Sequence, residues 1–367
     1  MNPLDELRAA RPAHLGETAP ADARTRTDEL AYAMAQEREG RSRPKTRVWG
    51  LSLLGAAAAA TAITLVGTDL VGGTAPRAPT PPVASAEKTP GGTAVTTLSA
   101  QQVLLAAAEK AEKEPETSGK YWHVRTEQRN LVVTDGGYVM EHRSFGEQWT
   151  TENGVWGHMQ SLGTRPVSDE DQRAWEAAGS PKMVRIPIPG RPGDAKLLDV
   201  PPGKPLTGHE KGKEIFWLGR NVTMADLRKL PEDADKLRAW LLPYFDSPQN
   251  DVPGNKDEWL FEVTSGLITA MPVSPEVRGA AFRMLADLPS VDTVGEVTDA
   301  AGRTGSAVAM RVRTADGEFQ QRLLIDTDTG RALARESVVI DRKGLEPGTV
   351  SSSETVTEAG WTDSRKG

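Results

Sequence analysis

Cysteine is absent from the 367 residues of this chain, and phenylalanine and tyrosine are rare, with six and four copies. Without a thiol the chain cannot form a disulfide, a cysteine nucleophile, a zinc ribbon, an iron–sulfur cluster or a lipidated cysteine anchor. Hydrophobic residues make up 38% of the chain and charged residues 26%. This composition is too polar for a multi-span transporter, but the nine tryptophans and the aliphatic content exclude disorder throughout.

Long hydrophobic runs are also absent, with one exception at residues 48–68. These 21 residues carry no charge, and as a helix they would span roughly 31 Å, close to the ~30 Å hydrocarbon core of a bilayer. Five Lys and Arg residues lie in the fifteen positions before the run, whereas Arg77 is the only basic residue in the fifteen positions from Gly67 onward. This asymmetry predicts a transmembrane helix whose N-terminal side is cytoplasmic.

Two other interpretations of the apolar run remain open. It can be a buried, alanine-rich helix of a soluble domain. It can also belong to a cleaved signal peptide, because Ala84-Ser85-Ala86 has the small-x-small form of a cleavage site. That site lies well beyond the end of the run, so the sequence favours a helix that is retained.

The run divides the chain into four predicted parts. Residues 1–47 form a cytoplasmic tail with nine basic and eight acidic residues, and residues 48–68 form the transmembrane helix. Residues 69–97 form a linker rich in Pro, Thr, Ala and Gly, which acts as an extended spacer. Residues 98–367 form an extracytoplasmic domain. Because the tail contributes +1 to a total charge of −7, the remainder carries −8, which argues against nucleic-acid binding.

The folded part begins with a predicted helix and continues with strands. Ser99 and Gln102 have capping-box spacing at the start of a helix over residues 98–114. Residues 120–162 place tryptophans, tyrosines and valines between Gly, Asn and Asp turns at about ten-residue spacing. That spacing predicts an antiparallel meander. A proline-rich stretch, residues 183–205, follows.

Helices and then strands are predicted for the remainder of the chain. Thr223 caps one helix and Pro231 begins the next, within residues 223–245. Further helices are expected over residues 256–271 and from Ser274 onward. Residues 308–340 alternate apolar and polar side chains around two turns, which predicts a three-stranded antiparallel meander. The order of strands, helices and strands predicts an α+β fold in which one curved, half-barrel-like antiparallel sheet packs against inserted helices.

Sequence motifs assign no catalytic, cofactor-binding or metal-binding residue. The histidines lack metal-ligand spacing, and we expect His123 and His142 to be structural; the five are His14, His123, His142, His158 and His209. No GxSxG elbow or phosphate-binding loop occurs. Residues 85–88 match SxxK by chance within the linker. Residues 326–330 resemble the start of a calcium loop, but Gly330 and Ser337 replace its later oxygen ligands, so a hairpin turn is expected.

Two sets of residues remain as weaker candidates for a site. Glu141, Glu147 and Glu152 lie on predicted strands, where a pair of carboxylates could hydrolyse a glycosidic bond. Four tryptophans could line a concavity that binds carbohydrate or lipid, although tryptophans in sheets mostly fill cores; they are Trp122, Trp149, Trp156 and Trp217.

The C-terminal half resembles a known family in its residue pattern. The pattern includes Ser274-Pro275-Glu276-Val277-Arg278, Asp299-Ala-Ala-Gly302-Arg303 and Leu324-Ile325-Asp326, and the segment from Leu227 to Leu237 also fits. Together with the tail, span and linker, this pattern is similar to an uncharacterised family of actinobacterial single-pass membrane proteins. The resemblance implies a membrane-anchored extracytoplasmic protein without assigned catalytic residues.

The layout of the exported part is also similar to two kinds of half-open β-barrel. These are the lipoprotein carriers and the periplasmic regulators that bind anti-sigma factors. In such folds a concave sheet covered by helices accepts an acyl chain, so the resemblance implies an acyl chain or an envelope protein as partner.

The sequence therefore favours a non-enzymatic, membrane-tethered sensor or ligand-binding domain in the cell envelope, without a cofactor. The first alternative is a transmembrane regulator linked to an extracytoplasmic-function sigma factor, although the 47-residue tail lacks a zinc motif of the His-x3-Cys-x2-Cys type. The second is an anchored cell-wall hydrolase that uses the three glutamates named above.

Overall fold

The computed structural model describes residues 98–365, except for 192, 212–213, 218–219 and 247–253. All of them belong to one compact unit, Gly50–Gly367. The predicted tail, span and linker, residues 1–97, lie outside the described part. Among the described residues, no helix combines the length and the apolar character needed to cross a membrane.

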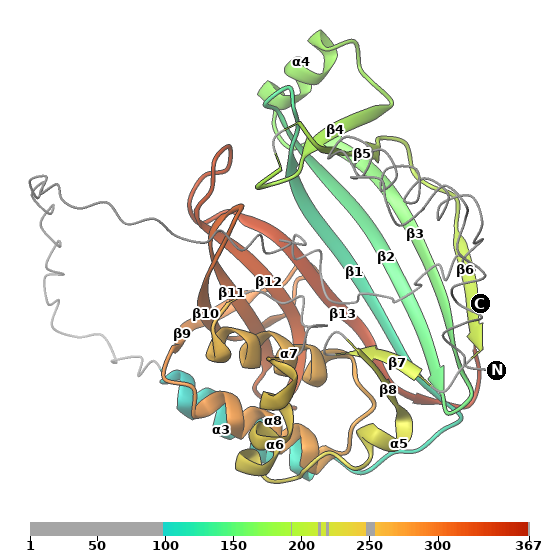
Figure 1. Cartoon of the computed structure of the whole chain (residues 1–367), viewed down its shortest axis with the longest axis vertical. Helices are drawn as coiled ribbons and strands as arrows, with labels where there is room; N and C mark the ends of the chain where they lie inside the picture. The colour runs from blue at the N-terminus through green and yellow to red at the C-terminus, as the bar shows by residue number, and fades with distance from the viewer. Residues whose placement is uncertain (1–97, 192, 212–213, 218–219, 247–253, 366–367) are drawn as a thin grey trace, which may run out of the picture. The chain divides into compact units, whose positions relative to one another are not determined.

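A nine-stranded antiparallel sheet forms the framework, in the order β6-β3-β2-β1-β13-β12-β11-β10-β9. It curves but does not close, since β6 and β9 lie at its two edges (Figure 1). The pairing of β1 with β13 joins two meanders that lie far apart in the chain. The strands are β1 (Tyr121–Val133), β2 (Val139–Thr151), β3 (Gly154–Pro166), β6 (Leu206–Lys211), β9 (Val291–Thr298), β10 (Thr304–Thr314), β11 (Gly317–Asp326), β12 (Arg331–Asp341) and β13 (Val350–Thr362).

The structure confirms the predicted α+β class and both predicted meanders. The first comprises β1, β2 and β3, and the second contains β10, β11 and β12. The second meander is longer than predicted, because β9 and β13 extend it on either side. Two small hairpins complete the strands, β4 (Met183–Pro187) with β5 (Ala195–Asp199) and β7 (Glu214–Trp217) with β8 (Arg220–Thr223).

The helices that pack on the sheet begin at side-chain caps. The predicted Ser99–Gln102 capping box starts α3 (Ala100–Lys113), and Ser274 caps α8 (Pro275–Ala286). Thr223 caps α5 (Met224–Leu227), as predicted. The prediction for Pro231 was wrong, because α6 (Ala234–Leu241) begins only after Asp233, whose side chain accepts a hydrogen bond from the Lys236 amide. The remaining α-helices of the described part are α4 (Asp169–Ala177), which was not predicted, and α7 (Lys256–Ala270), and a short 3-10 helix, η1 (Leu242–Tyr244), follows α6.

One face of the sheet carries these helices, and we call it the helix-covered face. Trp122 Nε1 donates a hydrogen bond to the Ala270 carbonyl at the end of α7, 2.9 Å away. Because side chains alternate along a strand, His123 lies on the opposite face. Leu323 and Ile325 point to the helix-covered face, where they join a core with Trp259 and the other large buried side chains of α3, α7 and α8.

The helix-covered face is covered by different elements at its two ends. Figure 1 shows α3, α6, α7 and α8 together at one end, and α4 with the β4–β5 hairpin at the other. At the second end Tyr138, Met140 and Val184 form a small separate core, against which Trp175 packs. The sheet and the helices leave a hollow near the end that α7 and α8 cover.

Candidate ligand-binding cleft

The structure does not bring the three candidate glutamates together. Six residues of one extended strand separate Glu141 from Glu147, a distance of roughly 20 Å, and Glu152 lies beyond the end of that strand. A glycosidase needs its two carboxyl groups within about 10 Å of each other. These glutamates therefore do not form a hydrolytic pair.

Each of these glutamates has an ionic partner instead. Glu141 is buried between Arg129 and Arg165, with the Arg165 guanidinium 2.7 Å away. Burial raises the pKa of Glu141, but the two arginines outweigh this effect and hold the pKa below its ordinary value. Glu152 forms an ion pair with Arg228. Glu141 is therefore an ionised structural group rather than a proton donor.

The four candidate tryptophans do not line one concavity. Trp122 lies on the helix-covered face, where its ring meets Trp361 edge to face at 5.6 Å. Trp149 and Trp156 lie on the opposite face and stack on His123 and His209. Trp217 belongs to β7, and its side chain lies outside the described part.

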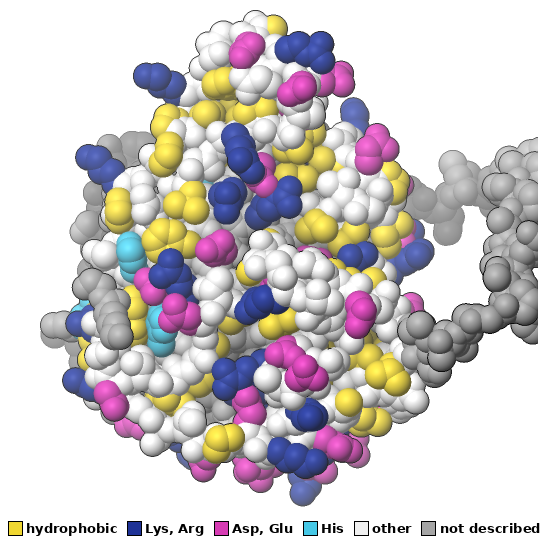
Figure 2. Space-filling model, turned by 180° about the vertical axis from the view of Figure 1, so that it is seen from behind, with side chains coloured by type: hydrophobic (Ala, Val, Ile, Leu, Met, Phe, Trp, Pro, Cys, Tyr) yellow, Lys and Arg dark blue, Asp and Glu magenta, His cyan; other side chains and the backbone are white. Residues whose placement is uncertain are grey.

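His123, His142 and His158 have partners among the neighbouring side chains, and His14 lies outside the described residues. On the opposite face Glu147 lies 3.3 Å from His123 and 3.6 Å from His158, and Figure 2 shows histidines beside charged side chains there. His142 is within hydrogen-bond distance, 3.0 Å, of Thr164 Oγ1, and burial lowers the pKa of its imidazole. Among the described residues, no group of histidine and carboxylate side chains is arranged to hold a metal ion.

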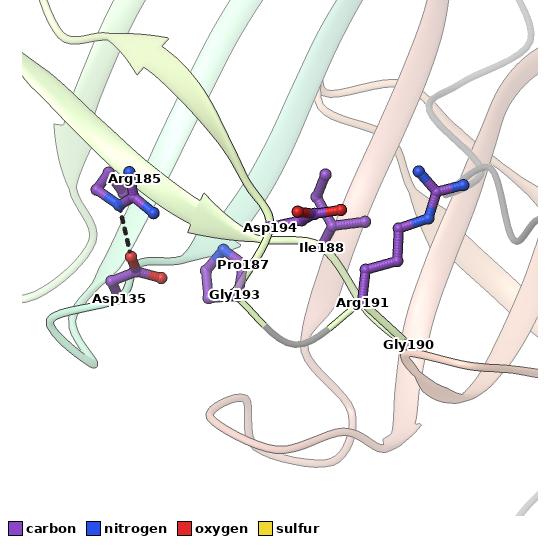
Figure 3. Close-up of a pocket in the computed structure, with 8 residues that line it drawn as sticks. All are labelled: Asp135, Arg185, Pro187, Ile188, Gly190, Arg191, Gly193 and Asp194. Carbon is purple, nitrogen blue, oxygen red and sulfur yellow. Dashed lines mark hydrogen bonds and ion pairs between the residues drawn. The ribbon is translucent and has the colours of Figure 1, made fainter. Parts of the chain in front are cut away.

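A small cavity of about 380 Å³ lies at the β4–β5 hairpin. Figure 3 shows Asp135 and Arg185 facing each other at one side of it, and their ion pair measures 2.9 Å. The hairpin and its turn supply most of the lining, including Pro187 and Ile188. Because Asp135 and Arg185 neutralise each other, this pair offers no free charge to a ligand.

A much larger cleft, of about 1030 Å³, lies at one end of the sheet. It is beside the C-terminal end of α7 and the N-terminal end of α8. Its walls are the loop between α3 and β1, the loop between α7 and α8, and the neighbouring parts of β12 and β13. Buried apolar side chains form its floor and come from four separate elements; they include Trp122, Leu227, Ile268, Val273 and Val277.

The cleft exists because two neighbouring strands of the sheet separate. β12 and β13 pair only between Ala334↔Thr355 and Val338↔Val350. Beyond Thr355, β13 continues to Thr362 and pairs with β1 alone. The start of β12 remains with β11, since Arg331 lies opposite Asp326. The two strands therefore diverge, and the opening between them becomes part of the cleft.

The four arginines that line the cleft all form ion pairs with carboxylates, and two of them share one carboxylate. Glu114 binds both Arg278, at 2.7 Å, and Arg331. Arg303 pairs with Asp299 at 2.6 Å, and Arg228 pairs with Glu152. Burial lowers the pKa of Arg278, and the charge and hydrogen bond of Glu114 counteract part of this effect. Glu114 thus fixes the positions of two arginines at the mouth.

Three of the exposed carboxylates in the lining have no such partner. Glu116, Glu232 and Glu276 are exposed, and none of them forms an ion pair with another residue of the described part. The surplus charge of the cleft is therefore negative, which favours a ligand that carries positive charge.

Sequence reasoning missed the strand that forms one wall of the cleft. β13 supplies Trp361 and the five residues before it. The Thr- and Val-containing run over residues 355–357 was an available signal for a strand, but the prediction ended at residue 340.

Comparisons with known proteins give only distant similarities. No protein-family model and no curated protein sequence matches the chain. A chain of the Pseudomonas aeruginosa MucA/MucB complex is similar, with 14% identity and a TM-score of 0.22 over 71% of this chain; the alignment spans 56% of that chain. A LolA superfamily protein from Nitrosomonas europaea is similar, with 7% identity and a TM-score of 0.17 over 73% of this chain and 96% of that chain.

These two structures agree with the looser fold-level similarity expected from the layout of the sequence. With TM-scores this low, neither of them supports a conclusion about function. The resemblance to an actinobacterial membrane-protein family stays a prediction.

Proposed function

We propose that this chain is a non-enzymatic ligand-binding protein, tethered to the membrane by residues 48–68, with its folded domain outside the cytoplasm. The cleft beside β13 is its binding site. The observation that carries the proposal is the separation of β12 from β13, which opens a hollow of about 1030 Å³ within an otherwise continuous sheet.

The lining of the cleft suits a ligand with both apolar and polar parts. Binding sites of this kind usually combine an apolar surface with a few placed polar groups. Here Trp122 and Ile268 lie in the floor, whereas Glu114, Arg278 and Arg331 form a fixed ionic group at the mouth. Burial of apolar groups on the floor supplies affinity, and the charged rim supplies selectivity.

The test uses the purified full chain and the neutral fluorescent amphiphile N-phenyl-1-naphthylamine. We expect the dye to bind, with a rise in fluorescence. Ala332→Trp should weaken binding at least tenfold, because Ala332 is half-buried in the lining and an indole there fills the space that the dye needs.

Ala178→Trp is the matched control, since Ala178 is exposed at the end of α4, far from the cleft. It should bind the dye as the unmodified chain does. Thermal unfolding of both variants establishes that they are folded. The proposal fails if the unmodified chain does not bind the dye, or if folded Ala332→Trp binds it equally well.

A further inference from the structure

One wall of the cleft is a strand edge without a neighbour. Residues 356–361 of β13 all line the cleft. On one side these residues pair with β1, except for Thr357, which lies in a β-bulge, and on the other side no strand of the described part pairs with them. In an antiparallel strand, every second residue directs its N–H and C=O groups away from the paired neighbour, and the bulge at Thr357 shifts this alternation by one residue. The cleft is therefore bordered by a row of open backbone donors and acceptors.

An open strand edge is a template for another strand. An acyl chain has no donors or acceptors that could satisfy these backbone groups, whereas an extended polypeptide has both at matching intervals. The open stretch contains six residues. At ~3.4 Å per residue it could pair with an extended segment of roughly six residues, about 20 Å long.

The side chains beside this edge define what such a segment would carry. Val356 and Trp361 border the apolar floor that Trp122 and Ile268 continue. An added strand would direct every second side chain towards that floor. The other side chains would point away from it, and the unpaired carboxylates of Glu116, Glu232 and Glu276 give the rim its surplus negative charge.

We propose that the ligand of the cleft is a segment of a partner polypeptide in which apolar and basic residues alternate, bound as an added strand on the open edge of β13. This inference rests on the proposed function and names its ligand class. The apolar side chains of the segment contact the floor, its backbone pairs with β13, and the surplus negative charge of the rim attracts its basic side chains.

Fluorescence anisotropy with a defined probe tests the pairing. The probe is an eight-residue peptide of alternating lysine and valine with a fluorescein label, added to the full chain. Two further versions carry N-methyl groups on the odd-numbered or on the even-numbered amides. Only one set of amides can donate to β13, so exactly one methylated version should lose at least tenfold in affinity. Equal affinity of both versions, or no binding of the parent peptide, would overturn the proposal.

The charge contribution is tested with variants of the chain. The triple variant Glu116→Gln, Glu232→Gln and Glu276→Gln should weaken binding of the lysine–valine probe about tenfold and reduce its dependence on salt. Glu346→Gln is the matched control, because Glu346 is an exposed glutamate at the opposite end of β13, and it should leave the affinity unchanged. An unchanged affinity in the folded triple variant contradicts the assigned role of the rim.

Competition with N-phenyl-1-naphthylamine separates this inference from the proposed function. Displacement of the bound dye by the lysine–valine peptide supports both. If the dye binds and Ala332→Trp weakens its binding, but palmitate displaces it and the peptide does not, the cleft is a lipid site and the peptide inference is wrong. If neither dye nor peptide binds, both proposals fail.

Discussion

At the scale of single residues, a buried charge network connects α7 to the sheet. Arg335 of β12 lies 3.0 Å from Glu262 of α7 and 3.7 Å from Glu354 of β13. One guanidinium thus serves two carboxylates, and Glu354 Oε2 has no hydrogen-bond partner among the described residues. Burial raises the pKa of Glu354 from 4.5 to about 7, and the attraction of Arg335 offsets only part of this effect.

The raised pKa predicts that the folded chain loses stability as the pH increases. The folded state holds the Glu354 proton up to about pH 7, whereas the unfolded state releases it near 4.5. Between these values the folded state binds more protons, so the free energy of unfolding should fall with rising pH, by about 3 kcal/mol at most. Urea unfolding of the full chain at pH 5 and pH 8 measures this change.

Glu354→Gln provides the comparison, because glutamine keeps the shape of the side chain and cannot ionise. The other titrating groups are the same in both proteins, so the difference between their pH profiles isolates Glu354. The Gln variant should be the more stable protein at pH 8 and should show a flatter profile. Parallel profiles would refute the raised pKa.

At the scale of secondary-structure elements, the turn between β11 and β12 docks against α3 beside the cleft. Gly330 in this turn has a φ of 72°, in the left-handed region. A Cβ added there would lie 2.6 Å from the Ala107 carbonyl oxygen and 2.9 Å from the Ala111 nitrogen. Both the backbone conformation and the close approach to α3 therefore require glycine.

We expect Gly330→Ala to lower the free energy of unfolding by about 2–4 kcal/mol, because it combines left-handed strain with a backbone clash. Gly302→Ala is the control, since Gly302 has a similar φ of 80° but nothing within 4 Å of an added Cβ. It should cost only about 1 kcal/mol. Equal losses in urea unfolding would show that the contact with α3 adds nothing.

Elements with a local signal could be predicted from the sequence, and elements defined by distant partners could not. Ser99, Thr223 and Ser274 mark helix starts because their caps involve residues only three positions away. β13 lacks a hydrophobic alternation, because Ser353 and Thr355 are buried on one face and Glu354 on the other. Its place in the sheet depends on β1 and β12.

The candidate site could not be predicted from the sequence either, because it also depends on residues that are distant in the chain. Glu141, Glu147 and Glu152 are suitable residue types, but only the structure shows that strand length separates them. The cleft arises where the pairing of β12 with β13 ends, and no local pattern marks Thr355 as the last paired residue.

At the scale of the whole molecule, the predicted anchor gives a test that is independent of the cleft. The full chain should remain in the membrane pellet after carbonate extraction, and deletion of residues 48–68 should release it. In intact spheroplasts an external protease should degrade an epitope tag placed at the C-terminus and spare one at the N-terminus. Carbonate-soluble full-length protein would refute the anchor, and the opposite pattern of tag protection would refute the orientation.

The position of β13 between β1 and β12 also affects how the chain is made. Every other strand of the sheet is translated before it. Until residue 362 has left the ribosome, β1 and β12 each have an open edge, because both edges pair with β13 in the finished sheet. During synthesis the two meanders therefore exist as separate halves, and the nascent chain is most exposed to mispairing and aggregation just before its central strand is complete.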